Sequence, residues 1–222
     1  MKAPSMLKVQ ALLFDLDNTL IDEGQYFDAV FAEFAKRWKK DAVEFQSALA
    51  ESLRRASRDI FGDVLKAVNF FSTDRQAELF HLYQTIEAKI RFYPDAQDLI
   101  SFARDRRWKL GIVTNGVVAA QKNKIKCLGA QDIFDCIIYA REFGKENEKP
   151  AARPFLEALL ALGVNNNEVV FIGDHSQNDI LGAKRVGLRN ILLNRSSETN
   201  PHDENADMCV KDLQQVKNFL KG

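Results

Sequence analysis

The chain has 222 residues, of which 46% are hydrophobic and 28% are charged, a composition typical of a folded globular protein. Its 31 basic residues balance 31 acidic residues, so it lacks the overall positive charge that attracts nucleic acids. No apolar stretch reaches the roughly 20 residues that cross a bilayer, the start lacks the apolar core of a secretory signal, and the three cysteines form no CxxC pair. We therefore expect a cytoplasmic protein, monomer or homodimer, without nucleic-acid polymers or membranes as partners.

Short apolar segments predict the strands of a buried parallel sheet. Each is too short for a helix and does not alternate strictly between apolar and polar residues, as expected when helices cover both faces of a sheet. The segments are residues 11–14, 110–113, 136–140, 169–173 and 191–193. Helical patterns at residues 96–107, 118–129, 153–163 and 177–187 separate the later segments. Strands that alternate with helices predict a doubly wound α/β fold.

Residues 22–92 have a different character, because no convincing strand occurs in them. Apolar residues recur there at helical spacing, in 26–38, 45–56 and 75–90. A connection of this length greatly exceeds a normal crossover between two strands. We therefore expect residues 1–21 and 93–222 to form an α/β core, and residues 22–92 to form a small helical cap domain.

Polar residues follow the predicted strands, at the end where open α/β sheets bind ligands. They are Asp15 and Asp17 after the first strand, Thr114 and Asn115 after the second, Lys149 on a loop after the third, and Asp174 and Asp179 after the fourth. If these strands are adjacent, four carboxylates converge. Two like charges 4 Å apart repel by about 4 kcal/mol at an effective dielectric constant of 20, so the cluster requires a cation or shifted pKa values. Oxygen ligands without a His or Cys cluster favour Mg²⁺.

Each of these residues also has a plain structural interpretation when it is taken alone. Asp15 and Asp17 fit the solvated end of a strand, and Asp179 fits a helix cap. Thr114 and Asn115 fit a simple turn, since Asn-Gly is a common turn pair, and Lys149 fits a solvated loop lysine. Only their combination at neighbouring strand ends favours a site.

The ordered set DLDNT at 15–19, TNG at 114–116, EKP at 148–150 and GDHSQND at 173–179 resembles the four motifs of the haloacid dehalogenase superfamily. The resemblance covers essentially the whole chain and is strongest to phosphatases with a helical cap inserted after the first motif, in the acylneuraminate-9-phosphatase and pyrimidine-nucleotidase branch. It implies a Rossmann-like core and a magnesium-dependent phosphatase that hydrolyses a small phosphomonoester.

By this resemblance, Asp15 is the nucleophile that forms an aspartyl-phosphate intermediate. Asp17 is the general acid that protonates the leaving oxygen and then the base that activates water. The implied metal ligands are Asp15, Asp17 through its backbone carbonyl, and Asp174. Dehalogenases of the family lack an acid at the position of Asp17, which favours phosphoryl chemistry.

The same resemblance implies that the remaining polar residues bind the substrate or neutralise charge. Thr114 and Asn115 bind or orient the phosphoryl group, and Lys149 neutralises charge on the nucleophile and on the transferred group. Asp179 acts with the catalytic residues by holding Lys149 or a water of the metal. His175 is interpreted as a solvent-facing loop residue.

Other functions fit parts of the pattern. A sugar phosphomutase of the same family keeps both acids of the first motif, whereas a receiver domain is shorter and lacks the cap. A binding protein that has lost turnover would not need every one of these residues. The identity of the phosphomonoester stays open, as do the cap residues that select it. Side chains considered for that role are Tyr26, Arg54, Arg55, Arg58, Phe70 and Phe71, although the aromatic ones suit packing and the arginines a solvated face.

Overall fold

The computed structural model describes residues 8–55, 59–195 and 202–221, and the chain divides into two compact units. Unit 1 consists of Met1–Asp22, Arg91–Val118 and Gly129–Gly222, and unit 2 consists of Glu23–Ile90 and Ala119–Leu128. Unit 1 holds the sheet and unit 2 is helical, and each unit is described here by itself.

Unit 1 is built on a six-stranded parallel sheet with strand order β3-β2-β1-β4-β5-β6. The strands are β1 (Ala11–Phe14), β2 (Lys109–Thr114), β3 (Cys136–Tyr139), β4 (Val169–Gly173), β5 (Arg189–Leu193) and β6 (Met208–Val210). This is the strand order of Rossmann-type folds, so the predicted doubly wound parallel sheet is confirmed. Strand order reverses direction between β1 and β4, and a crevice forms at such a switch point.

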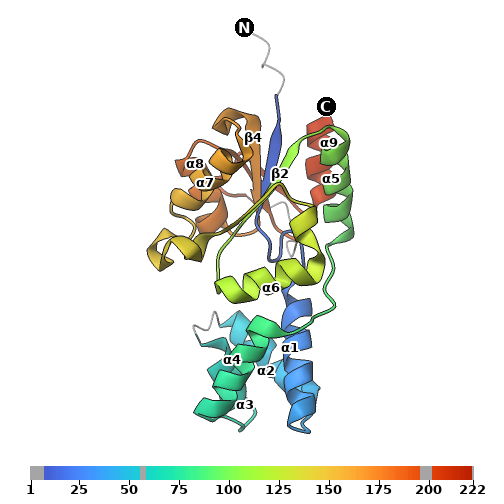
Figure 1. Cartoon of the computed structure of the whole chain (residues 1–222), viewed down its shortest axis with the longest axis vertical. Helices are drawn as coiled ribbons and strands as arrows, with labels where there is room; N and C mark the ends of the chain where they lie inside the picture. The colour runs from blue at the N-terminus through green and yellow to red at the C-terminus, as the bar shows by residue number, and fades with distance from the viewer. Residues whose placement is uncertain (1–7, 56–58, 196–201, 222) are drawn as a thin grey trace. The chain divides into compact units, whose positions relative to one another are not determined.

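Helices cover both faces of this sheet (Figure 1). Helices α5 (Pro94–Asp105) and α9 (Leu213–Lys221) pack together on one face, and α7 (Arg153–Leu162) and α8 (Leu181–Arg185) lie on the other. On the α7 face, Leu13 of β1 and Phe171 of β4 share one core cluster with Phe155 of α7. Because successive strand residues point to opposite faces, Leu12 and Phe14 face the α5–α9 layer.

Replacement of Phe155 by alanine is expected to destabilise unit 1 strongly. The Phe155 ring is fully buried and lies edge-on against Phe171, with ring centroids 5.1 Å apart. Truncation of a buried phenylalanine costs about 3–5 kcal/mol in the free energy of unfolding, measured by urea denaturation. Leu156→Ala is the matched control, since this next residue of α7 is 52% exposed and should change stability by less than about 0.5 kcal/mol. Equal losses in the two variants would contradict the assigned core.

Unit 2 has an aromatic core between helices. Its helices are α1 (Glu23–Arg37), α2 (Ala42–Arg54), α3 (Ile60–Ala67), α4 (Thr73–Thr85) and α6 (Val118–Leu128). Of α6, Ala119–Leu128 belongs to this unit. Phe31 and Phe34 of α1 pack against Phe45 of α2, with ring centroids 6.1 and 5.8 Å apart. The helical pattern predicted to run to residue 90 ends at Thr85, because Ile86 adopts an extended conformation.

Helix α6 groups with the helices of unit 2, although the alternation of strands and helices predicted it among the helices of the core. Lys124 of α6 is fully buried, and its Nζ lies 3.0 Å from Oε1 of Glu23 on α1. Asn123 donates from Nδ2 to Oη of Tyr26 at 2.8 Å and to the carbonyl of Ile86 at 2.6 Å. A partly buried ion pair and a polar network of this kind hold α6 to unit 2 more specifically than apolar contact alone.

The cap side chains considered for substrate contact have different surroundings in unit 2. Tyr26 is fully buried and donates its hydroxyl hydrogen to the carbonyl of Tyr83 at 2.6 Å, so it packs within the unit. Arg54 and Arg55 are exposed, and both form ion pairs with Glu51 of α2. Arg58 lies outside the described residues.

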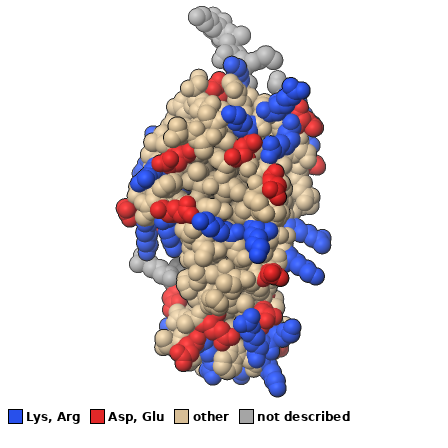
Figure 2. All heavy atoms as spheres, in the orientation of Figure 1, with Lys and Arg blue, Asp and Glu red and all other residues tan. Residues whose placement is uncertain are grey.

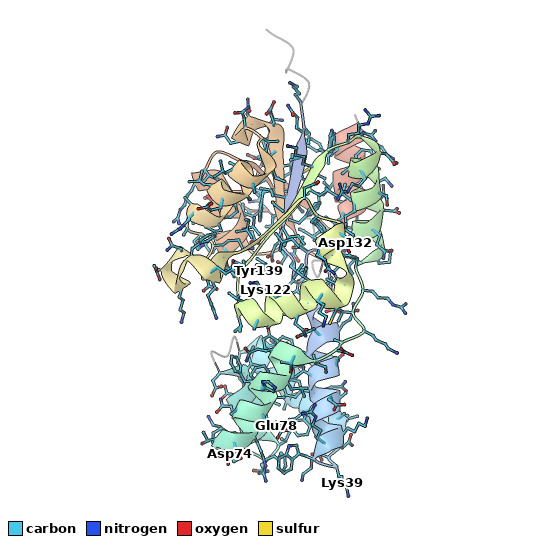
Figure 3. The ribbon with its side chains drawn as sticks, viewed as in Figure 1. Lys39, Asp74, Glu78, Lys122, Asp132 and Tyr139 are labelled. Carbon is cyan, nitrogen blue, oxygen red and sulfur yellow. The ribbon has the colours of Figure 1, made fainter. Side chains whose placement is uncertain are left out.

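On α4, Glu78, labelled in Figure 3, accepts a hydrogen bond from the Trp38 indole at 3.1 Å.

The surface carries charges of both signs. Figure 2 shows Lys and Arg side chains interspersed with Asp and Glu side chains on the face in view. This mixture agrees with the balanced composition of the chain. In the described ranges, every helix is too short or too polar to span a bilayer.

Candidate functional site

Asp15 and Asp174 lie close together because they follow neighbouring strands of the sheet. Asp15 is the first residue after β1 and Asp174 is the first after β4, and β1 pairs directly with β4. The backbone N–H of Asp15 donates to the carbonyl of Ile172 at 2.9 Å, which continues the ladder past the end of β1. Residues separated by more than 150 positions in the sequence are thereby placed at the switch point of the sheet.

Lys149 joins two of the carboxylates. Its Nζ lies 2.6 Å from Oδ1 of Asp15 and 2.6 Å from Oδ1 of Asp179, and the residue is only 4% exposed. Burial alone would lower the pKa of Lys149, but the two carboxylates outweigh burial and raise it. The ammonium group therefore stays charged at neutral pH, in direct contact with Asp15.

Asp179 reaches this position through a π-helical turn and a glycine. It lies in η5 (Ser176–Ile180), and π-turns of this kind occur often at functional sites. Its Oδ2 accepts a hydrogen bond from the backbone N–H of His175 at 3.0 Å. A Cβ at Gly173, the last residue of β4, would lie 2.6 Å from Cβ of Asp179, so only glycine permits this approach.

Three carboxylates form a group that fits a divalent cation. One oxygen from each of Asp15, Asp174 and Asp179 lies within 4.8 Å of the other two. Burial raises the pKa of Asp15, and the neighbouring carboxylates raise it further against the opposing effect of Lys149. Burial and the charge of Asp179 raise the pKa of Asp174 to about 7. A hard cation with oxygen ligands would relieve this repulsion, and Mg²⁺ is bound by such groups.

The side chain of Asp17 does not belong to this group of three carboxylates. Asp17 is half-buried and lines the same pocket, so its ligation through the backbone carbonyl stays a prediction. Thr19 of the same motif contacts Asp174 instead, with Oγ1 donating to Oδ1 at 3.4 Å. Thr19 was not among the predicted site residues, although its place in the DLDNT motif was a signal for it.

The loop after β2 is attached to the loop that carries Lys149. Thr114 is buried at the end of β2. The side chain of Asn115 donates from Nδ2 to the carbonyl of Lys149 at 3.0 Å and accepts the Lys149 N–H on Oδ1 at 2.8 Å. The predicted contact of Asn115 with substrate is therefore accompanied by a second role, because both polar atoms of its amide fix the backbone at Lys149.

All seven predicted site residues line one pocket of about 190 Å³. The lining consists of Asp15, Asp17, Asn18, Thr114, Asn115, Lys149, Asp174, His175, Asn178 and Asp179. Asn18, His175 and Asn178 lay outside the predicted set, although all three occur within the quoted motifs. His175 is exposed, and its Nδ1 accepts the backbone N–H of Asn178 at 3.2 Å. The pocket thus combines a charged ammonium group, several carboxylates and polar amides.

Comparisons with known proteins show the family of the chain. The haloacid dehalogenase-like hydrolase family matches residues 12–193. A glyceraldehyde 3-phosphate phosphatase of Methanopyrus kandleri is 26% identical over 219 residues, which cover 90% of each chain. A phosphoserine phosphatase of Thermus thermophilus is 31% identical over 179 residues, covering 81% of this chain and 71% of the relative.

A solved structure is similar to this chain over nearly its whole length. The crystal structure of a HAD phosphatase from Thermococcus onnurineus superimposes with a TM-score of 0.66 and 28% sequence identity, covering 96% of this chain and 99% of that one. The resemblance drawn from the four motifs is thus confirmed at the level of the family. The chain belongs to the haloacid dehalogenase-like hydrolases, and its named relatives there are phosphatases.

Proposed function

We propose that this protein is a magnesium-dependent phosphatase that hydrolyses a small phosphomonoester through an aspartyl-phosphate intermediate on Asp15. The observation that carries the proposal is the contact of a buried, charged Lys149 with Asp15, beside carboxylates grouped closely enough to hold a cation. A phosphoryl group brings negative charge, and the ammonium group and the cation together would offset it.

Asp15 is proposed as the nucleophile because it lines the pocket and its carboxylate is held by Lys149. Attack of this carboxylate on phosphorus would divide hydrolysis into two steps, formation and breakdown of an acyl phosphate. Lys149 lies where it can neutralise charge on Asp15 and on the phosphoryl oxygens. Thr114 and the backbone after it are proposed to bind those oxygens.

Asp17 is proposed as the general acid and base because it lines the pocket two residues after the nucleophile and stands outside the group of three carboxylates. It would give a proton to the leaving oxygen and later take one from water. Mg²⁺, when bound, would supply positive charge for the transferred group. Asp15 and Asp174 would hold it with their side chains and Asp17 with its backbone carbonyl, while Asp179 would hold Lys149.

The substrate class is proposed from the relatives. Two of them are named for glyceraldehyde 3-phosphate and phosphoserine, which are both small phosphate esters. We extend this to a small phosphomonoester such as a sugar phosphate or a nucleoside monophosphate. Residues 22–92 are proposed to act as the cap that selects the leaving group.

A cytoplasmic location is proposed because the three cysteines are free thiols.

The test is a phosphate-release screen over small phosphomonoesters, with magnesium present or removed by EDTA. We expect release from at least one ester with magnesium, a loss of about 100-fold or more with EDTA, and recovery on return of the metal. Activity that is unchanged by EDTA would contradict the metal proposal. Isomerisation of a sugar phosphate on addition of its bisphosphate, without net phosphate release, would indicate the mutase instead.

A further inference from the structure

Glu148 forms a partly buried connection just outside the proposed site. Its side chain is 14% exposed, and its Oε1 accepts hydrogen bonds from the backbone N–H of Gly116 and from Nε of Arg141, both at 2.9 Å. Its Oε2 accepts a third from Nη2 of Arg141 at 3.1 Å. A forked pair between arginine and a carboxylate is geometrically specific and stronger than a neutral hydrogen bond.

These contacts extend the attachment already made by Asn115. Asn115 bonds the backbone of Lys149, and the adjacent Gly116 bonds the side chain of the adjacent Glu148. The loop after β2 and the loop that carries the lysine are therefore joined at two consecutive positions on each side. Neither Glu148 nor Arg141 lines the pocket.

We propose that Glu148, held by Arg141, is a positioning residue that places the Lys149 ammonium group and the loop after β2 in register for phosphoryl transfer. This inference rests on the proposed function. Glu148 precedes the lysine in the chain and bonds the loop that begins with Thr114 and Asn115. Glu148 is thus joined to Lys149 by a peptide bond and to the proposed phosphate-binding loop by a side-chain hydrogen bond.

The need for such a residue follows from the geometry at Lys149. Its Nζ lies 2.6 Å from both Asp15 and Asp179, so a shift of the Lys149 backbone either moves the ammonium group or forces the lysine side chain into another rotamer. A displacement of about 1 Å in a positioned group can cost about 100-fold in rate. The loss falls on interactions made in the transition state more than on binding of the ester.

The experiment measures phosphate release by Glu148→Ala, Glu148→Gln and Arg141→Ala beside the wild-type protein. We expect kcat to fall about 30- to 100-fold in Glu148→Ala with less than a threefold change in KM. Glu148→Gln should recover much of the rate, because its amide oxygen can still accept the Gly116 N–H. Arg141→Ala should lose about 5- to 10-fold. Glu146→Gln, at an exposed glutamate two residues earlier, should behave as the wild type.

Inhibition by orthovanadate, which mimics the transferred phosphoryl group, separates positioning from general damage. Its inhibition constant should rise in Glu148→Ala in parallel with the loss of kcat, whereas inhibition by inorganic phosphate should change less. Thermal unfolding gives the folded fraction of each variant. If Glu148→Ala folds poorly, Arg141→Ala provides the test, because the Arg141 side chain is partly exposed.

The outcomes distinguish this inference from the proposed function. If the wild-type protein releases no phosphate from any ester, the proposed function fails and the inference with it. If the wild type is active and Glu148→Ala keeps its kcat and its vanadate inhibition, only the inference is overturned. Loss of activity in proportion to the folded fraction, in both Glu148→Ala and Arg141→Ala, would likewise overturn it, since it would show a purely structural role.

Discussion

Replacement of Asp15 by asparagine is expected to abolish phosphate release, with kcat/KM lowered by at least about 10⁴-fold. Asparagine has nearly the same shape and can still accept a hydrogen bond from Lys149, whose Nζ lies 2.6 Å from Oδ1 of Asp15 in the native site. An amide oxygen is a very poor nucleophile, so the acyl phosphate cannot form. The rate is measured with the best ester from the screen, at saturating magnesium.

A matched control keeps this result interpretable. Asp132→Asn makes the same chemical change at an exposed position on the short helix η1 (Ala130–Asp132), where Figure 3 labels the residue. It should leave kcat/KM within twofold of the wild type. Rapid quenching of the wild-type reaction should show one phosphoryl group on the peptide that contains Asp15. Normal turnover by Asp15→Asn, or a phosphoryl group on another residue, would remove Asp15 as the nucleophile.

Replacement of Lys149 by methionine is expected to lower kcat by about 10³-fold and to destabilise the protein. Methionine keeps the length of the side chain but leaves Asp15 and Asp179 without the cation that now contacts both. Loss of one partner from a buried ion pair costs about 3–5 kcal/mol, because the remaining charges stay buried. Urea denaturation measures the loss of stability, and phosphate release measures the loss of rate.

The stability of Lys149→Met should depend on pH with a definite sign. Burial already raises the pKa of Asp15, and removal of the ammonium group raises it further. A carboxyl whose folded pKa is raised destabilises the fold at neutral pH, and this penalty disappears as the pH falls and the group is protonated. The deficit should therefore be largest near pH 7 and smaller near pH 5. Lys145→Met, at an exposed lysine of the preceding turn, should show neither effect, and a pH-independent deficit would contradict the argument.

Much of the fold was predictable from local patterns. The apolar segments at 11–14 and 169–173 became the central strands β1 and β4 with the same bounds, because a strand buried on both faces must be apolar throughout. Helix α7 (Arg153–Leu162) has Pro154 in its first turn and is followed by Gly163, which caps it in a left-handed conformation with φ of 61°. Such signals lie within a few residues of the element that they define.

Other features of the fold depended on contacts that sequence patterns do not reveal. Lys124 looks like a surface lysine on an amphipathic helix, yet it is fully buried against Glu23, more than 100 positions away in the chain. The same long-range pair places α6 with the helical unit and not with the sheet. Helix periodicity specifies which face is apolar, but it does not specify the partner of that face.

At the site, local patterns indicate which residues stand at strand ends, because a strand buried on both faces ends where its apolar run ends, and four short motifs indicate the family. The combination of those strand ends depends on the folded chain. Nζ of Lys149 lies between Asp15 and Asp179. The Asn115 amide bonds the backbone of Lys149, and Glu148 accepts the N–H of Gly116. The physical reason is separation along the chain. Hydrogen bonds and ion pairs between residues 30 to 134 positions apart arise from strand order and close packing, neither of which is encoded in any local stretch.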